Sequence, residues 1–320
     1  MDMITLRIRP LSPFGTPLLG DTLFGQLCWA IRHQAGEARL QALLEGYRVG
    51  RPFAVVADAF PTGYLPRPAL PLSGFEQPVD ADRKHLKKRQ WIPYDALHQP
   101  LRSWLKFAHT DAEVTGKPDF KLRENWLQPH NSINRQTGTT GEGSFTPYIM
   151  QQIGFAPEVT LDLHVIFDPM RVDVAELQAW WTGIGASGFG RDASIGLGKF
   201  AVTEVVETGL PAQPDANAYL TLAPCAPQGC GFLPEASRYQ PFTRFGRHGD
   251  LAVQKGQPFK TPVLLAAAGA VLKPARYVAT CFVGQGLGGD GRLSRAIPET
   301  VHQGYAPVVG VHLPEREKSS

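Results

Sequence analysis

A glycine-rich stretch between a predicted helix and a predicted strand holds the residues of this chain best suited to binding chemistry. It contains two Gly-apolar-Gly units separated by five residues, with one cation inside the stretch and another directly after it. Glycine accepts a positive φ and has no Cβ, so another backbone can come close and meet outward N–H groups. Arginine can bind a phosphate through two hydrogen bonds, and lysine adds a point charge. The residues are Gly188, Gly190, Gly196, Gly198, Arg191 and Lys199, with Phe189, Ile195 and Leu197 as expected anchors in the core.

Other phosphate-binding patterns fail the test of context. GxGxxG-type matches begin at Gly188 and Gly284, but a dinucleotide site needs this pattern directly after a strand and at the start of a helix. The first match has the reverse order, and too few residues follow the second for a βαβ unit. A Walker A loop is absent because Phe200 follows Lys199 where Ser or Thr is required. The stretch is interpreted as a loop for an anionic backbone, or as a connection that only lets helix and strand pack closely.

Two further segments carry clustered cations. The run from Arg83 to Arg89 is suited to lying along phosphates, but also to a solvated face or an acidic protein partner. The segment from Arg238 to His248 interleaves cations with aromatic rings, which suits the stacking of unpaired bases, although such rings also fill protein cores. The candidate RNA contacts are Lys84, Lys87, Lys88 and Arg89 in the first segment, and Arg244 and Arg247 in the second.

A polar stretch from Asn131 to Gly143 is predicted to be a loop, with His130 at its start and Arg135 within it. Histidine can act as a general base near neutral pH, so His130 is also a candidate for removing the 2′-OH proton in RNA cleavage. A loop histidine beside amides and an arginine more often hydrogen-bonds to a base or to backbone. His130, Asn131 and Arg135 are therefore predicted to contact RNA, and no catalytic residue, metal or cofactor is predicted.

Composition limits the class of protein. The chain has 320 residues, 43% of them hydrophobic, which fits about two domains. We expect a cytoplasmic protein without a membrane partner, because no signal-like or bilayer-spanning apolar run is present. The four cysteines include no C-x-x-C pair, which argues against a zinc ribbon. Because the net charge is only +3, a nucleic-acid surface must come from local clusters.

The apolar pattern predicts an α+β fold. Strands are expected at 4–8, 53–60, 161–167 and 199–206, and helices are expected to begin at the N-caps Asp21 and Asp173. Together with a long insertion at about 61–157, this gives the βαββαβ order of a ferredoxin-like, or RRM-like, domain. Within the insertion, Tyr94 to Phe107 has helical spacing. A linker near 209–217 is expected to separate residues 1–209 from a strand-rich region at 210–320.

With this order of elements, the glycine loop resembles the signature of the repeat-associated mysterious protein (RAMP) superfamily of CRISPR-Cas RNA-binding proteins. Other segments are similar to the fourth Csm subunit of type III-A effector complexes, and together they touch most of the chain. They are LGDTLFGQLCWA (Leu19 to Ala30), HNSINRQTG (His130 to Gly138), FKTP (Phe259 to Pro262) with Gly269, and YAP (Tyr305 to Pro307).

The resemblance implies two ferredoxin-like domains, the first at 1–209 with the insertion and the glycine loop 188–199, and a degenerate second at 210–320. It implies a non-catalytic subunit that binds the 5′ repeat-derived handle of crRNA in antiviral defence. The implied partners are the large cyclase-like type III subunit and the backbone RAMP subunits. The alternative is a metal-independent RAMP endoribonuclease that processes precursor crRNA.

Overall fold

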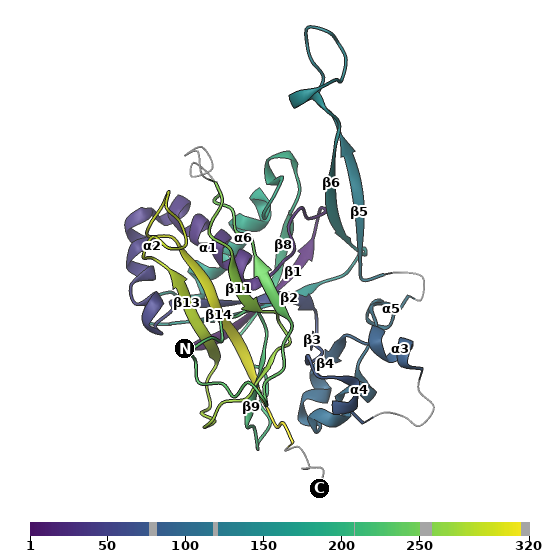
Figure 1. The fold of residues 1–320 in the computed structure, drawn as a ribbon, viewed down its shortest axis with the longest axis vertical. Helices are drawn as coiled ribbons and strands as arrows, with labels where there is room; N and C mark the ends of the chain where they lie inside the picture. Colours follow the sequence, from purple (N-terminus) through teal and green to yellow (C-terminus); the bar gives the residue numbers. More distant parts are fainter. Residues whose placement is uncertain (77–81, 118–120, 208, 250–257, 315–320) are drawn as a thin grey trace.

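The computed structural model describes residues 1–76, 82–117, 121–207, 209–249 and 258–314 (Figure 1). The helices are α1 (Gly20–Ala35), α2 (Glu37–Leu44), α3 (Arg83–Lys88), α4 (Trp104–Phe107), α5 (Asp111–Thr115) and α6 (Val174–Ser187). The strands are β1 (Asp2–Pro10), β2 (Ala54–Pro61), β3 (Tyr64–Pro66), β4 (Trp91–Pro93), β5 (Arg123–His130), β6 (Tyr148–Phe155), β7 (Leu161–Phe167), β8 (Phe200–Val206), β9 (Ala218–Thr221), β10 (Pro241–Arg244), β11 (Val263–Ala266), β12 (Val271–Leu272), β13 (Phe282–Gly288) and β14 (Val301–Val311). The α+β class is confirmed. Of the helices described, none is long and apolar enough to cross a membrane.

The first sheet has the strand order β2-β7-β1-β8, and every neighbouring pair is antiparallel. Its strands come from both sides of the insertion, so the predicted order strand, helix, strand, insertion, strand, helix, glycine loop, strand is confirmed. α6 begins as predicted: the Asp173 side chain accepts from the N–H of Glu176 at 2.7 Å, within a capping box. Two helices and four strands thus bring the glycine loop to the edge of this sheet.

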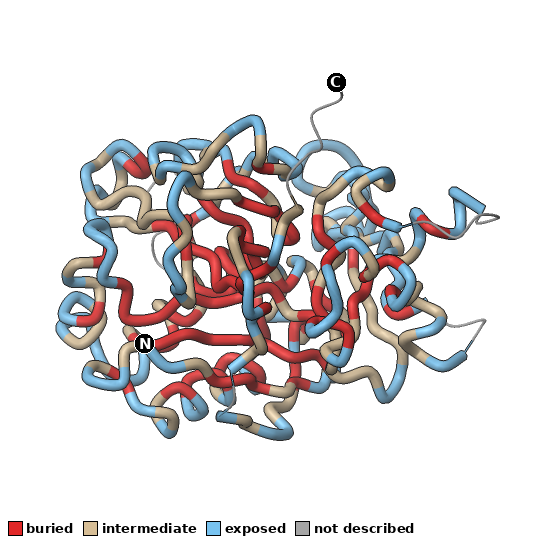
Figure 2. Tube along the Cα trace, turned by 90° about the horizontal axis from the view of Figure 1, so that it is seen from below, coloured by how far each residue is buried: buried red, intermediate tan, exposed pale blue. Residues whose placement is uncertain are grey.

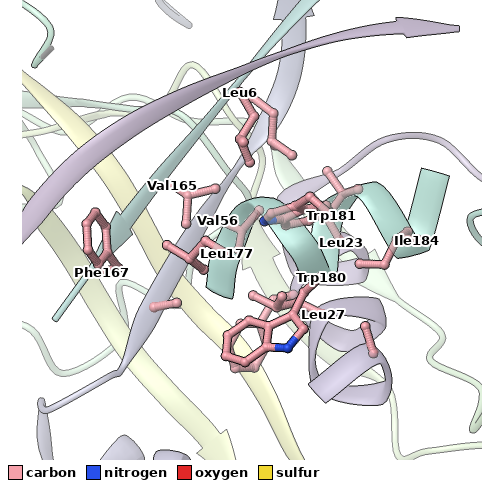
Figure 3. Close-up of a cluster of buried hydrophobic side chains, with 14 of the residues drawn as sticks. Leu6, Leu23, Leu27, Val56, Val165, Phe167, Leu177, Trp180, Trp181 and Ile184 are labelled. Atoms are coloured by element: carbon pink, nitrogen blue, oxygen red, sulfur yellow. The ribbon is translucent and has the colours of Figure 1, made fainter. Parts of the chain in front are cut away.

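The core of this half lies between the sheet and the helices α1 and α6. Period-two alternation puts Ile4, Leu6 and Ile8 of β1 on the face toward the helices, where all three are buried. Trp180 and Trp181 of α6 are also buried, as expected of packing residues, and Figure 3 shows them among the side chains of this cluster. Buried positions run through the middle of the molecule, along the strands (Figure 2).

The opposite face of the same sheet carries polar side chains that the insertion covers. Thr5 Oγ1 lies 2.8 Å from His164 Nδ1, and the Tyr94 hydroxyl lies 3.0 Å from His164 Nε2. Tyr94 also donates to Asp162 at 3.1 Å, and Asp162 accepts from Arg7 at 3.1 Å. Because each of these groups has a partner, the network can be buried, and it fixes the insertion on the sheet.

The insertion has a compact part and a projecting part. The compact part holds β3, β4 and the short helices α3 to α5, whereas the hairpin β5–β6 extends away from the body of the molecule (Figure 1). The expected helix from Tyr94 to Phe107 is wrong: 3₁₀ turns at Tyr94–His98 and Leu101–Ser103 precede the one-turn helix α4. Pro100 explains the break, since proline cannot donate within a helix.

The half after residue 209 is described as strands and loops, without a helix in the described ranges. Its sheet has the order β12-β9-β14-β13, all antiparallel, and β10 pairs with β11 in a separate ribbon. Gly284 and Gly286 lie inside β13, so the second GxGxxG match does not open a helix. The expected domain boundary near residue 209 stays a prediction.

The two halves meet at a bulge in β2, where the pairing with β7 shifts between Val56 and Ala59. A bulge leaves backbone groups without partners in the ladder. The Gln303 side chain of β14 accepts from Val56 N at 2.8 Å and donates to Val56 O at 2.7 Å. Asp58 N donates to Leu222 O at 2.8 Å. The second half therefore satisfies backbone groups that the first half leaves open.

Candidate nucleic-acid interface

The glycine loop between α6 and β8 uses all four predicted glycines at positive φ. The φ angles are 100° at Gly188, 79° at Gly190, 100° at Gly196 and 74° at Gly198. Asp192 also has a positive φ, of 66°, and a single 3₁₀ turn at Ala193–Ile195 follows it. The expectation that these glycines are needed for their backbone conformation is confirmed.

The protein's own atoms fill most of the space that these glycines leave. A Cβ would lie 2.4 Å from Leu197 O at Gly188, 2.6 Å from the Thr16 side chain at Gly190 and 2.1 Å from Phe189 O at Gly198. A Cβ at Gly196 would meet nothing within 4 Å. The amides of Ile195, Gly196 and Leu197 donate within the loop, so the expected outward N–H groups are not found there. Gly196 is therefore the glycine of this loop that is open to an external backbone.

The two cations of the loop are exposed, Arg191 between the two Gly-apolar-Gly units and Lys199 directly after the second. The Arg191 guanidinium donates to Gln151 O of β6 at 2.5 Å and to the Asp192 carboxylate at 3.1 Å, which holds it over the base of the hairpin. Lys199 N donates to Ser12 Oγ at 2.9 Å, leaving the ammonium group on the surface. Phe189 and Leu197 are buried anchors, but Ile195 is 64% exposed, so its expected place in the core is wrong. It follows Asp192 on the outer 3₁₀ turn.

The loop is joined to the segment after β1 and to the base of the hairpin. Gly198 N donates to Pro13 O at 2.7 Å, and Arg191 N donates to Thr16 Oγ1 at 2.9 Å. Phe14 and Ile153 exchange two backbone hydrogen bonds, at 2.8 and 2.9 Å. Sequence reasoning missed Thr16 and Gln151 as supports of Arg191, because neither belongs to a local motif.

A groove of about 600 Å³ lies beside this junction. Trp126 lies across Gly154 in its wall, since a Cβ on Gly154 would be 2.5 Å from the indole ring. Arg9 and Lys121 line the groove together with Glu124 and Glu158, so its charged residues balance. An aromatic wall with mixed charges is a polar groove without a strong preference for an anion.

His130, Asn131 and Arg135 lie at the far end of the hairpin rather than beside the glycine loop (Figure 1). His130 is the last residue of β5, and its ring stacks on Tyr148 with the ring centres 5.4 Å apart. Its Nε2 atom is buried without a hydrogen-bond partner. Asn131 and Arg135 are exposed in the loop that follows. The hairpin thus carries these three residues away from the glycine loop.

The basic run forms α3 in the compact part of the insertion. Lys84, Lys87 and Lys88 are exposed along it. Arg89 lies just beyond the helix and turns inward, donating to Lys106 O at 3.2 Å with Glu113 3.7 Å away. Any contact of Arg89 with RNA would require these internal interactions to open.

Arg244 and Arg247, two of the predicted RNA contacts, face opposite sides of the chain. Arg244 donates twice to the Asp21 carboxylate, at 2.7 and 2.9 Å, and its side chain is only 16% exposed. Burial would raise the pKa of Asp21, but the His302 ring 3.3 Å away and the hydrogen bonds from Arg244 lower it overall. Arg244 therefore has an internal partner in place of the expected phosphate, whereas Arg247 is exposed.

Among the described residues, no three His, Cys, Asp or Glu side chains gather as a metal site would require. The four cysteines are free thiols. Burial raises the pKa of Cys28 and of Cys225 to about 12, so these two thiols are protonated at neutral pH.

No family model and no curated protein matches the sequence. Solved structures match over nearly the whole chain. The Csm1-Csm4 cassette in complex with pppApA has a TM-score of 0.61 at 17% identity, covering 99% of this chain and 100% of that chain. The Csm3-Csm4 subcomplex of the type III-A CRISPR-Cas interference complex has a TM-score of 0.60 at 14% identity, covering 98% and 100%. Csm4 is the component that both complexes name, and the expected resemblance to the fourth Csm subunit is confirmed as a likeness of fold.

Proposed function

We propose that this chain is a non-catalytic, cytoplasmic RNA-binding subunit of a type III-A CRISPR-Cas effector complex. It binds the 5′ repeat-derived handle of the crRNA and docks the large cyclase-like subunit beside backbone RAMP subunits, in antiviral defence. The observation that carries the proposal is the Csm4-like fold over 99% of the chain. Csm1 and Csm3 are the partners named with Csm4 in the solved complexes, which supports the two kinds of protein partner.

We further infer that both halves derive from ferredoxin-like domains. The order β2-β7-β1-β8 with α1 and α6 supports this for residues 1–209. The four-stranded antiparallel sheet after residue 209, described without helices, supports a degenerate second copy.

The glycine loop supports RNA binding through a limited set of its residues. Gly196 offers a face without a side chain, and the exposed Arg191 and Lys199 place positive charge before and after it in the loop. Phosphate contacts of this kind hold a nucleic acid without reading its sequence. The other glycines shape the loop and are not expected to touch RNA.

Gly196→Val tests this role. The new side chain projects into open space, so it should obstruct an RNA backbone and lower the crRNA content of the co-expressed effector complex by roughly tenfold. Gly36→Val is the matched control, because Gly36 also has a positive φ, of 89°, and a Cβ there would likewise meet nothing within 4 Å. The measurement is the ratio of crRNA to protein on a denaturing gel. Equal crRNA in both variants and in the wild type would refute the role of the loop.

The non-catalytic assignment has its own test. The purified chain, incubated with labelled repeat RNA and EDTA, is expected to leave the RNA intact, and His130→Ala should change nothing. The stacking of His130 on Tyr148 supports a binding role, since a flat aromatic pair is also a surface for a base. Specific cleavage that His130→Ala slows by about 10² to 10⁴ would instead establish the metal-independent endoribonuclease.

A further inference from the structure

The ribbon formed by β10 and the residues around β11 buries charged side chains and exposes aromatic ones, the reverse of the usual distribution. Two of its cations lie inward: Arg244 reaches Asp21, and burial lowers the pKa of Lys260. His248 is buried and lies 2.8 Å from Ser294 Oγ. Two of its aromatic rings point outward, with Phe245 74% and Phe259 71% exposed. Large aromatic side chains normally bury their area, so this outward face is incomplete without a ligand.

The strand pairing of the ribbon explains why Phe245, Arg247 and Phe259 share its outward side. His248 N donates to Pro258 O at 2.7 Å and Lys260 N donates to Gly246 O at 2.8 Å, which brackets the bridge between Arg247 and Phe259. Arg247 and Phe259 are therefore a non-hydrogen-bonded pair, the kind in which facing side chains come closest. The Arg247 guanidinium lies 5.9 Å from the centre of the Phe259 ring. Phe245, two residues before Arg247, shares its side of the ribbon.

A bulge that contains Phe245 and Gly246 lies between the bridge of Arg247 with Phe259 and the regular part of the ribbon. Between the pairs Arg244 with Val263 and Arg247 with Phe259, two residues of one strand oppose three of the other. Leu264, opposite Thr243, extends the outward face and is 57% exposed. The exposed rings therefore belong to a defined surface, which we call the aromatic ribbon face: Phe245, Arg247, Phe259 and Leu264.

The charge around this face favours an anionic ligand. Residues 238–249, 258–267 and 292–298 contain no aspartate or glutamate. Thr261, next to the ribbon, donates to Arg292 O at 2.7 Å, which brings the exposed Arg292 and Arg295 to the same region. Arg292 is 91% exposed, with the Asp290 carboxylate 3.9 Å away. Aromatic rings among arginines form the surface that unpaired nucleotides prefer.

The aromatic ribbon face is tied to the glycine loop by a short segment. Asp21 holds Arg244 on one side, and five residues earlier Thr16 accepts from Arg191 N on the other. Residues 16–21, of which Leu18, Gly20 and Asp21 are buried, thus fix the loop and the ribbon to the same part of the first half.

We propose that the aromatic ribbon face binds single-stranded RNA by stacking unpaired bases on Phe245 and Phe259, while Arg247 contacts a phosphate. This proposal rests on the proposed RNA-binding function and adds a second RNA contact to the glycine loop. Stacking distinguishes it from a purely electrostatic surface, because only unpaired bases present their faces to a ring.

The test uses the full chain and fluorescein-labelled oligoadenosine of about ten nucleotides, with affinity measured by fluorescence anisotropy at fixed salt. The double variant Phe245→Ala with Phe259→Ala should bind roughly tenfold to a hundredfold more weakly, as expected when two stacking rings are lost. Tyrosine at both positions should restore binding. Phe107→Ala is the matched control, because Phe107 is a partly exposed ring on α4, outside this face. Binding of duplex RNA should not change in any of these variants.

The outcomes separate the two proposals. If the wild-type chain binds no RNA, the proposed function fails. If the wild type binds and Gly196→Val weakens it, but the double alanine variant binds oligoadenosine like the wild type, the glycine loop stands and the ribbon proposal is overturned. Loss of the large subunit from the complex in that variant would then identify the face as a protein interface. Equal losses for single-stranded and duplex RNA would also overturn stacking.

Discussion

His164 is held without charge between the first sheet and the insertion. Thr5 and Tyr94 lie within hydrogen-bond distance of its two ring nitrogens, and the side chain is fully buried. Burial lowers the pKa of His164 from 6.5 to about 4, although Asp162 opposes the shift. The unfolded chain therefore takes up a proton at a higher pH than the folded protein does, and stability falls as the pH falls.

We expect the free energy of unfolding to drop by about 3 kcal/mol between pH 6.5 and pH 4 through this one group. The measurement is urea unfolding across that range. His164→Gln should flatten the pH dependence even if it lowers stability throughout, whereas His85→Gln, at an exposed position on α3, should keep the wild-type slope. An unchanged slope in His164→Gln would show that other groups control the acid sensitivity.

Asp21 shows what residue types alone do not reveal. The sequence predicts it as the N-cap of α1, but the helix begins at Gly20, whose N–H donates to the buried Asp58 at 2.7 Å. Asp21 is instead the partner of Arg244, 223 residues away. Local spacing predicted the N-cap of the helix to within two residues, Asp21 against the observed Leu19, because helix initiation is largely a local property. It could not predict an ion pair between the two halves, which also removes Arg244 from the exposed cations.

The strands and helices differ in how well the sequence predicts them. The sequence predicts β1, β7, β8 and the cap of α6, because alternating apolar residues and a capping pair are patterns within a few neighbouring residues. The hairpin β5–β6 was missed, since most side chains of β5 are exposed and Pro129 lies within it. A strand with solvent on both of its faces carries no apolar alternation. His130, one of the candidate RNA contacts, ends this strand, which the apolar pattern did not predict.

The glycine loop was predicted in position and in backbone conformation, but its neighbours were not. Positive φ at four glycines follows from residue type alone. The space beside three of these glycines is filled by atoms of Thr16, Phe189 and Leu197, and only folding brings those atoms to the glycines. This difference reduces four candidate RNA-facing glycines to Gly196.

The two halves are joined where β2 is irregular, so their stabilities should be coupled. Gln303 is fully buried and supplies both partners for the backbone of Val56, which lies next to the bulge on the edge strand β2. If the halves were separate domains with a loose contact, each would be expected to satisfy its own buried backbone groups. The contacts of Gln303 with Val56 and of Arg244 with Asp21 therefore join the half that carries the glycine loop to the half that carries the aromatic ribbon face.

Gln303→Leu tests this coupling. It keeps the approximate volume but leaves the N–H and C=O of Val56 buried without partners, so it should destabilise the protein by about 2–5 kcal/mol. Gln285→Leu is the matched control. Gln285 lies on the neighbouring β13, and its side chain donates a single, exposed hydrogen bond to Gln228 O at 2.7 Å, so the loss of stability should stay near 1 kcal/mol.

Urea unfolding followed by tryptophan fluorescence and by circular dichroism gives both values. The wild type should unfold in one transition, because the joint transmits the loss of either half to the other. Two separate transitions in the wild type, or equal costs for the two leucine variants, would mean that the halves are stabilised independently and that Gln303 does not join them.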